Sequence, residues 1–309
     1  HFLDKVFDAP SMHTGFANVL ALIGYSLQIY GDFSGYTDIA IGVALLMGFQ
    51  LPVNFNSPYK ALNCGDFWKR WHISLSTWLK DYLYIPLGGN RNSTIGTFVF
   101  SLLFVVILVV AINNLAFTLI TGLLLVAGSA VAFFYKPFER YLTTNINIML
   151  TMLIGGLWHG ASWKFVIWGG LNGLGVVAYK YWRKISPYEN SNLWVARVWK
   201  IAFTFAFISF TRVFFRSNDM ESVNQWFDQV AHNMDWGSAM QVMKYNNISL
   251  GIILIGYITH WLPQSWKDYT EHVFAESHYV VKVAIALVVV LICYQAYSTD
   301  LQPFIYFQF

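Results

Sequence analysis

The stretch NSTIGTFVFSLLFVVILVVAINNLAFTLITGLLLVAGSAVAFFY, Asn92–Tyr135, contains no Asp, Glu, Lys, Arg or His in 44 residues. A helix needs about 20 apolar residues to cross the hydrocarbon core of a bilayer, which is about 30 Å thick. This stretch is therefore long enough for two crossings. The polar pair Asn113-Asn114 falls midway, where a turn is expected. The sequence predicts a helical hairpin in a membrane.

The whole chain has the composition of a membrane protein. Of its 309 residues, 56% are hydrophobic and 11% are charged, against about 45–50% and about 25% in soluble domains. An aromatic content of 18% and a mean hydropathy of +0.47 fit the same class. These values exclude a disordered chain, a disulfide scaffold and an ordinary cytosolic enzyme. The net charge of +3 provides no concentrated basic face, which excludes nucleic acid as a partner.

Seven further apolar runs bring the predicted apolar segments to about nine. None alternates as barrel strands do, and backbone groups in lipid must be paired internally, so helices are expected. We therefore predict an all-α polytopic membrane protein in which the shorter segments are tilted, broken or re-entrant. The seven runs are Phe16–Tyr30, Thr37–Phe49, Ile146–Trp158, Trp163–Tyr181, Val198–Phe215, Ile248–Leu262 and Val280–Tyr297.

The charges between these runs predict an orientation, because basic loops face the cytoplasm. Asn54–Asn92 and Tyr179–Lys200 carry five basic residues each and are expected inside. Ser217–Asn246 carries four acidic residues against one lysine and is expected outside. The first residues, HFLDKVFDAP, lack the basic start and apolar centre of a signal peptide, and the chain starts at His1. We expect it to be a piece of a longer protein.

Two regions concentrate polar residues within or beside apolar segments, where such residues are costly and therefore functional candidates. The first is FWKRWHISLSTWLKDYLYIPLGGNR, Phe67–Arg91. Apolar residues at helical spacing predict one amphipathic helix there, with His72 on its polar side. The alternative role for such a helix is to lie in the headgroup region with aromatic anchors. The apolar face comprises Phe67, Trp71, Leu75, Trp78 and Tyr82.

The second region, TMLIGGLWHGASWKFVIWGGLNG over Thr151–Gly173, places His159 at the end of an apolar run. Gly155, Gly156 and Gly160 allow a neighbouring helix or an acyl chain to approach closely. An imidazole buried there is expected to stay neutral and to accept a proton near pH 7, as a general base for a hydroxyl requires. The alternative is a histidine satisfied within the core.

A third cluster, YGDFSGYTD over Tyr30–Asp38, places Asp32 and Asp38 between two apolar runs. Paired acids can relay protons, but they can also cap a helix end or pair with Arg212 or Arg216. No HExxH, Gly-Lys-Ser/Thr or paired-cysteine motif supports a metal or nucleotide-phosphate site. The remaining polar candidates are interpreted as solvated or interfacial histidines (His1, His13, His232, His260, His272 and His278) and unpaired structural thiols (Cys64 and Cys293).

Three long motifs resemble the membrane-bound O-acyltransferase (MBOAT) family, and most closely its alginate O-acetylation (AlgI-like) branch. They are IYGDFSGYTDIAIGVALLMGFQLPVNFNSPY (29–59), FWKRWHISLSTWLKDYLYIPLGGNR (67–91) and LIGGLWHGASWKFVIWGGLNG (153–173). The resemblance continues more loosely through SFTRVFFRS (209–217) and PFIYFQF (303–309). It implies a multi-helix bundle around a central tunnel that joins a cytosolic acyl donor to an acceptor beyond the membrane.

The resemblance also implies roles for single residues. The catalytic histidine of the family stands in the WHG motif and corresponds to His159 here. The other histidine of the family stands in the RWHISLS motif and corresponds to His72. Side chains expected to line the tunnel are Trp71, Ser76, Trp158 and Asn56.

Three departures from the family pattern are visible. Relatives carry further apolar helices before the Gly24 region, so we expect a single MBOAT domain over 1–309 that lacks its N-terminal helices. About fifty residues, about 93–144, separate LGGNR from the WHG segment, where close relatives have a short link. They predict an inserted helical hairpin that preserves the relative sidedness of the two histidines. Asn172 stands where many relatives have His and is expected to be dispensable.

The resemblance predicts O-acyl transfer, with acetyl as the expected acyl group. The expected donor is acetyl-CoA or another cytosolic acyl thioester, and no bound cofactor or metal is expected. His159 is expected to deprotonate the hydroxyl, and His72 to position a substrate or stabilise the oxyanion. The expected setting is the bacterial cytoplasmic membrane, with an extracytoplasmic SGNH-hydrolase-like partner. Alginate, cellulose, another exopolysaccharide and peptidoglycan stay open as acceptors, as do direct transfer and a covalent intermediate.

Two other functions compete with this prediction. A transporter or flippase often shows internal symmetry and paired broken helices, and the sequence has neither. A non-catalytic assembly scaffold could retain the fold. Both alternatives would tolerate the loss of His159, whereas a transferase would not.

Overall fold

The structure is a computed structural model that describes residues 2–297, and these residues form helices and turns without a strand. The predicted all-α class is thereby confirmed, while PFIYFQF (303–309) lies outside the described residues. The first helices are α1 (Phe2–Asp8), α2 (Gly15–Leu46), α3 (Cys64–Trp68), α4 (Ile73–Leu79), α5 (Ile95–Ile112), α6 (Leu115–Phe134) and α7 (Lys136–Trp158). The others are α8 (Trp163–Ile185), α9 (Trp194–Arg216), α10 (Met220–His232), α11 (Ala239–Tyr245), α12 (Asn247–Trp261), α13 (Gln264–Glu276) and α14 (Tyr279–Tyr297).

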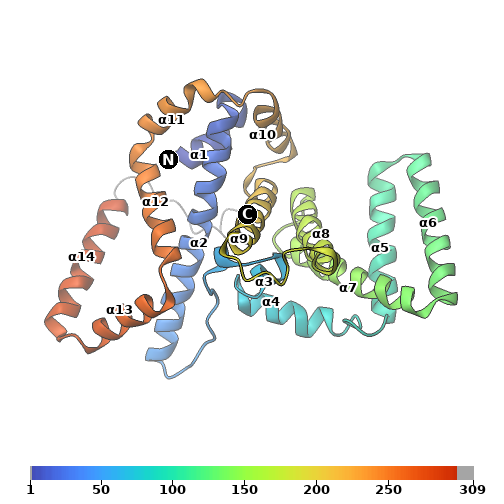
Figure 1. The fold of residues 1–309 in the computed structure, drawn as a ribbon, viewed down its shortest axis with the longest axis horizontal. Coiled ribbons are helices and arrows are strands. Elements are labelled where there is room, and N and C mark those ends of the chain that lie inside the picture. The colour runs from blue at the N-terminus through green and yellow to red at the C-terminus, as the bar shows by residue number, and fades with distance from the viewer. Residues whose placement is uncertain (1, 298–309) are drawn as a thin grey trace.

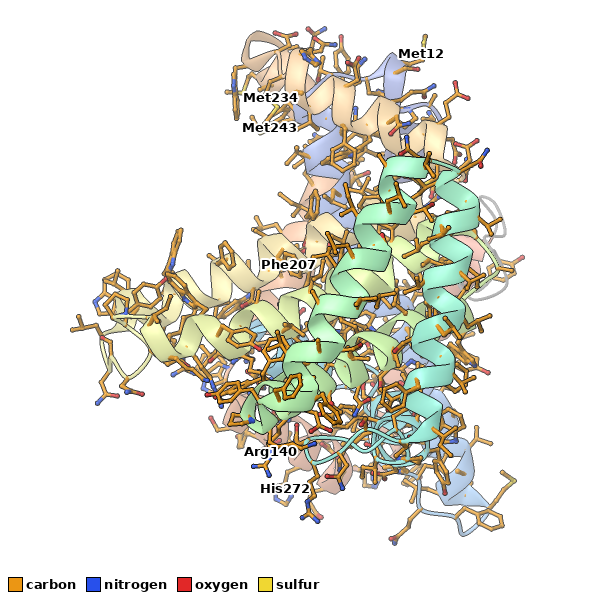
Figure 2. The ribbon with its side chains drawn as sticks, turned by 90° about the vertical axis from the view of Figure 1, so that its right-hand side faces the viewer. Met12, Arg140, Phe207, Met234, Met243 and His272 are labelled. Atoms are coloured by element: carbon orange, nitrogen blue, oxygen red, sulfur yellow. The ribbon has the colours of Figure 1, made fainter. Side chains whose placement is uncertain are left out.

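The uncharged stretch forms the predicted hairpin, in which α5 and α6 stand side by side at one edge of the molecule (Figure 1). Asn113 turns the chain in the left-handed conformation, with φ of +47°, which asparagine tolerates better than most residues. The Asn114 side chain then caps α6 by accepting a hydrogen bond from the Phe117 amide (3.0 Å). In Figure 2 this hairpin faces the viewer and passes in front of the other helices.

The hairpin is attached to the rest of the fold near its first residues and through α7. Thr97 is the one buried residue of α5, and α6 has none. The Thr97 hydroxyl donates to the Leu87 carbonyl (2.7 Å), and the buried Asn147 side chain of α7 donates to the Gly89 carbonyl (3.1 Å). Apolar side chains therefore cover the hairpin on all sides, as they do on a helix that contacts lipid.

By length and composition, α5, α6 and α9 could each cross a membrane. The pair α13 and α14 passes the same test only jointly, and it bends by 116° between the two helices. The nine predicted apolar runs fall in helices, but the number of spans stays a prediction. The predicted break between Phe16–Tyr30 and Thr37–Phe49 is wrong, because α2 runs without interruption from Gly15 through both runs to Leu46. Glycines inside a helix cost only about 1 kcal/mol each, so Gly31 and Gly35 do not interrupt it.

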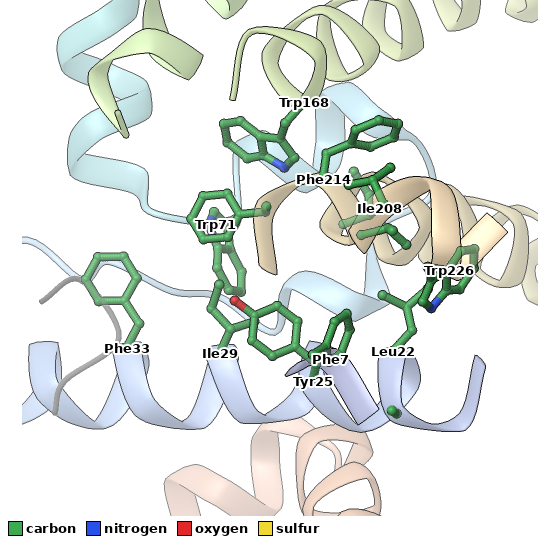
Figure 3. Close-up of a cluster of buried hydrophobic side chains, with 14 of the residues drawn as sticks. Phe7, Leu22, Tyr25, Ile29, Phe33, Trp71, Trp168, Ile208, Phe214 and Trp226 are labelled. Atoms are coloured by element: carbon green, nitrogen blue, oxygen red, sulfur yellow. The ribbon is translucent and has the colours of Figure 1, made fainter. Parts of the chain in front are cut away.

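The hydrophobic core lies among α1, α2, α3, α8, α9 and α10, each of which contributes buried side chains to it (Figure 3). One face of α2 contributes Tyr25, Ile29 and Phe33 to it. Figure 3 places Trp71, which follows α3, between Ile29 and Trp168 of α8. Segments far apart in the sequence therefore converge around a cluster of large rings.

Candidate active site

Glycines at the crossing of α7 and α8 fix the position of His159. A Cβ atom on Gly156 would lie 2.3 Å from the Phe165 carbonyl oxygen, and one on Gly169 would lie 2.3 Å from the Met152 carbonyl oxygen. Only glycines allow the two backbones to approach so closely. Because His159 follows the last turn of α7, this contact sets the place of its side chain against α8.

Aromatic rings surround His159 on three sides. The centre of its imidazole lies 5.0 Å from the ring of Trp158, 5.0 Å from that of Trp168 and 5.2 Å from that of Phe215. All three meet the imidazole edge-on. These contacts restrict the orientation of the imidazole, and the His159 side chain is half-buried. A base for a hydroxyl benefits from both effects.

His72 lies at a sharp break between α3 and α4, in the left-handed conformation with φ of +46°. The prediction of one continuous amphipathic helix over 67–82 is therefore wrong. The loop that follows α2 stabilises this break. The Asn54 side chain on that loop accepts hydrogen bonds from the Ser74 amide (3.1 Å) and hydroxyl (3.0 Å). The Ile73 amide also donates to the Asn54 carbonyl (3.0 Å). A non-glycine residue at positive φ is strained, and such strain often occurs at functional sites.

The two histidines line one cavity of about 30 Å³, although 87 residues separate them in the sequence. The Trp158 ring touches both, 6.3 Å from His72 and 5.0 Å from His159 between ring centres. A cavity of this size holds roughly one or two water molecules or a small reacting group. Its other polar walls are Asn172, Thr211 and Arg212.

A second and larger cavity of about 310 Å³ adjoins the first. The two share Trp68, Leu75, His159 and Trp168 as lining residues, so His159 lies in their common wall. The larger cavity is apolar along α7 and carries polar and basic side chains on the other side, namely Lys69, Ser76, Lys80 and Tyr84. A molecule in the larger cavity could thus present one end to His159.

Arg212, predicted from the sequence only as a possible partner for Asp32 or Asp38, lies in the wall of the smaller cavity. It is 4% exposed on α9, and its Nη1 donates to the Tyr59 hydroxyl (2.8 Å). Its guanidinium lies 5.1 Å from the centre of the Tyr59 ring and 4.9 Å from that of Trp71. A buried cation stacked on rings beside both histidines is a functional candidate. The signal was present, since Arg212 interrupts the apolar run SFTRVFFRS.

Of the four residues predicted to line the tunnel, two line the cavities described above and two do not. Trp71 lines the smaller cavity and Ser76 the larger one. Trp158 contacts both histidines but is 57% exposed, and Asn56 is exposed in the loop before α3, where its amide donates to the Arg70 carbonyl (2.9 Å). Asn172 is buried in the wall of the smaller cavity, where its side chain donates to the Trp168 carbonyl (2.8 Å).

The predicted helix-end position of Asp32 and Asp38 is wrong. Both lie within α2, where neither can cap a terminus, and both are exposed. Arg216 forms ion pairs with two acids of α1, Asp4 (3.2 Å) and Asp8 (3.8 Å). This arginine therefore ties α9 to the first helix of the chain.

Comparison with known proteins gives consistent matches. Residues 4–109 match the family profile described as MBOAT, membrane-bound O-acyltransferase family. The chain is 38% identical over 222 residues to a peptidoglycan O-acetyltransferase of Helicobacter pylori, covering 72% of this chain and 33% of that protein. It is 33% identical over 248 residues to a probable alginate O-acetylase AlgI of Pseudomonas aeruginosa (77% and 36%), and 30% identical over 196 residues to a teichoic acid D-alanyltransferase of Bacillus subtilis (62% and 39%). The chain spans about a third to two fifths of the length of these relatives.

Proposed function

Because the chain belongs to the membrane-bound O-acyltransferase family, as its motifs predict, we propose that it transfers an acyl group, acetyl in the first instance, to a hydroxyl. The donor would be a cytosolic acyl thioester such as acetyl-CoA, and the acceptor a cell-surface or exported polysaccharide. The observation that carries this proposal is the position of His159 in the wall between two cavities.

The larger cavity has the properties that a thioester donor requires. Its volume of about 310 Å³ falls in the range of small-molecule sites, about 300–1,000 Å³. Lys69 and Lys80 at its edge belong to Asn54–Asn92, the stretch whose charge predicts a cytoplasmic position. Their ammonium groups suit the phosphates of a coenzyme thioester, while the apolar side along α7 suits the arm that leads to the acyl group.

In the proposed reaction His159 removes the proton from the acceptor hydroxyl as the oxygen attacks the thioester carbonyl. A carbon–oxygen bond forms, the carbon–sulfur bond breaks, and the proton passes from the imidazole to the departing thiolate. His72 faces the same small cavity, from which it can donate a hydrogen bond to the carbonyl oxygen or orient the hydroxyl. Arg212 adds positive charge in the wall where negative charge develops.

The setting of the reaction is part of the proposal. The protein would be a multi-pass protein of a bacterial cytoplasmic membrane, and an extracytoplasmic SGNH-hydrolase-like protein would complete delivery to the polymer. The names of the relatives favour a polymer acceptor, since they refer to peptidoglycan, alginate and teichoic acid. The genes beside this one would identify the polymer, because a polysaccharide synthase or an SGNH partner would specify the pathway.

The test is a His159→Ala variant of the intact protein in its native membrane, with His272→Ala as the matched control on an exposed face of α13. Loss of a general base lowers the rate about 10²–10⁴-fold, so O-acetyl groups on the polymer should fall to background. Membrane insertion and protein amount should stay unchanged in both variants. Normal acetylation in His159→Ala would refute the proposal and favour a transporter or scaffold.

A further inference from the structure

Positive charge gathers beside the turn between α12 and α13, away from both cavities of the candidate active site. The Lys60 ammonium donates to the Leu262 carbonyl (2.9 Å), and the Lys267 ammonium donates to the His260 carbonyl (3.3 Å). Among residues 2–297 neither lysine forms an ion pair with a carboxylate. Each ammonium has three N–H groups, so both retain donors for a further acceptor.

These cations repel one another. Desolvation and the charges of Lys267, Arg70 and Arg197 lower the pKa of Lys60 below its usual value. Arg70 is neutralised by Asp66 (2.9 Å), but Arg197 is exposed on the first turn of α9. An anion bound among Lys60, Lys267 and Arg197 would relieve this repulsion.

A buried histidine adjoins the same lysines. The prediction that His260 is solvated or interfacial is wrong, because it is 3% exposed, with its ring 4.9 Å from that of Tyr30 and 5.1 Å from that of Tyr59. Within the described part of the chain, neither of its ring nitrogens has a hydrogen-bond partner. The imidazole therefore packs against Tyr59, the residue that precedes Lys60 in the chain.

An apolar groove of about 320 Å³ begins next to these charges, between α2, α9 and α12. Three pairs of neighbouring residues in the sequence link the basic cluster to this groove. Lys60 follows Tyr59, Arg197 precedes Val198, and the Leu262 carbonyl that holds Lys60 follows Trp261. The residues at these points that line the groove are Tyr59, Val198 and Trp261, and α9 adds Ile201, Ala202 and Phe205.

Four exposed tryptophans lie on the helices that carry the basic cluster and the groove. Trp194 and Trp199 on α9, Trp261 at the end of α12 and Trp266 on α13 are each at least 46% exposed. Tryptophan is enriched at the level of the lipid headgroups, where its ring contacts acyl chains and its N–H contacts water. The basic cluster therefore lies near the level of lipid phosphates, and the apolar groove leads away from it.

We propose that this place binds one anionic phospholipid, with its phosphate held by Lys60, Lys267 and Arg197 and an acyl chain in the groove between α9 and α12. Basic pockets between membrane helices recognise lipid headgroups in this way. Tyr59 forms a wall of the groove and also accepts the hydrogen bond from Arg212. A bound lipid would consequently brace the wall behind the two histidines. The proposal is independent of the reaction assigned to His159.

The experiment is native mass spectrometry of the intact, delipidated protein titrated with phosphatidylglycerol and, separately, with phosphatidylcholine of the same chains. Each basic residue near a headgroup contributes about fivefold in affinity, so Lys60→Gln/Lys267→Gln should bind phosphatidylglycerol about 30-fold more weakly. The control Lys180→Gln/Lys184→Gln, which removes two lysines from α8, should bind as the parent does. The exposed Arg197→Gln change should weaken binding about fivefold even where the double variant fails to fold.

A second set of measurements separates a phospholipid from a free phosphate. Ala202→Trp fills the groove without changing charge, so it should weaken phosphatidylglycerol binding, and millimolar inorganic phosphate should not displace the lipid. Equal affinity for the two lipids, equal loss in the α8 control, unchanged binding in Ala202→Trp, or displacement by inorganic phosphate would each overturn the proposal.

Discussion

Replacing Gly156 by alanine should damage the candidate active site severely, because it adds a methyl group where the backbones of α7 and α8 touch. The added Cβ would lie 2.3 Å from the Phe165 carbonyl oxygen and 3.2 Å from the Gly169 Cα. Ordinary contact begins at about 3.4 Å, so the two helices must separate by about 1 Å. The obstacle is backbone on both sides, which cannot rotate away as a side chain can.

The size of the effect follows from where this separation occurs. Gly156 precedes His159 by less than one turn, so the imidazole moves with the end of α7. A misplacement of about 1 Å in a catalytic group costs about 10²-fold in rate. Overpacking of a well-packed contact costs about 1–3 kcal/mol of stability as well. We expect transfer to fall about 100-fold with a modest loss of thermal stability.

Gly170→Ala is the matched control, because its Cβ would meet only the Leu153 side chain, at 3.5 Å. The assay is transfer of a radiolabelled acetyl group to the polymer in membranes that contain equal amounts of each variant. Thermal unfolding in detergent reports the change in stability. If Gly156→Ala retained the activity of Gly170→Ala, the inference that this crossing positions His159 would be refuted.

Three further predictions concern single residues. His72→Ala should lower acetyl transfer strongly but less than His159→Ala, and full activity in a kinetic assay would contradict a positioning role. Arg212→Lys should cost about 1.5–3 kcal/mol of stability in thermal unfolding, because lysine lacks the planar group that stacks on the rings and donates to Tyr59. Tyr59→Phe should cost a similar amount, and an unchanged stability in either variant would contradict the contact. An impermeant thiol reagent on intact cells should label Cys at position 221 but not at position 189 once Glu221 or Glu189 is replaced, and the opposite pattern would reverse the orientation.

The hairpin and the close helix contact beside His159 could be predicted from the sequence because their signals are local. An uncharged stretch with an Asn-Asn pair at its centre permits little besides two helices and a turn, and Asn113 and Asn114 make that turn. The glycines before His159 likewise predict a close helix contact without saying which helix is the partner. Composition and spacing are sufficient for such features.

The break at His72 and the burial of His260 could not be predicted, since both depend on distant segments. The local pattern over 67–82 favours one helix, and Asn54, on the loop that leaves α2, holds the break instead. His260 ends an apolar helix and looks interfacial in sequence, yet the rings of Tyr30 and Tyr59 cover it. A tertiary contact overrides a local pattern in each case.

The position of the hairpin in the chain also delays the assembly of the candidate active site during synthesis of the protein. The walls of the small cavity come from residues on both sides of α5 and α6 in the chain, and its two histidines are 87 positions apart. At about 5–20 residues per second, a ribosome needs about 4–17 s to pass from one histidine to the other. Throughout that interval the strained turn at His72 exists without α7 and α8, and both helices of the hairpin are synthesised first. The last component of the site to leave the ribosome is α9, so a nascent chain gains its buried Arg212 only after every other wall is made.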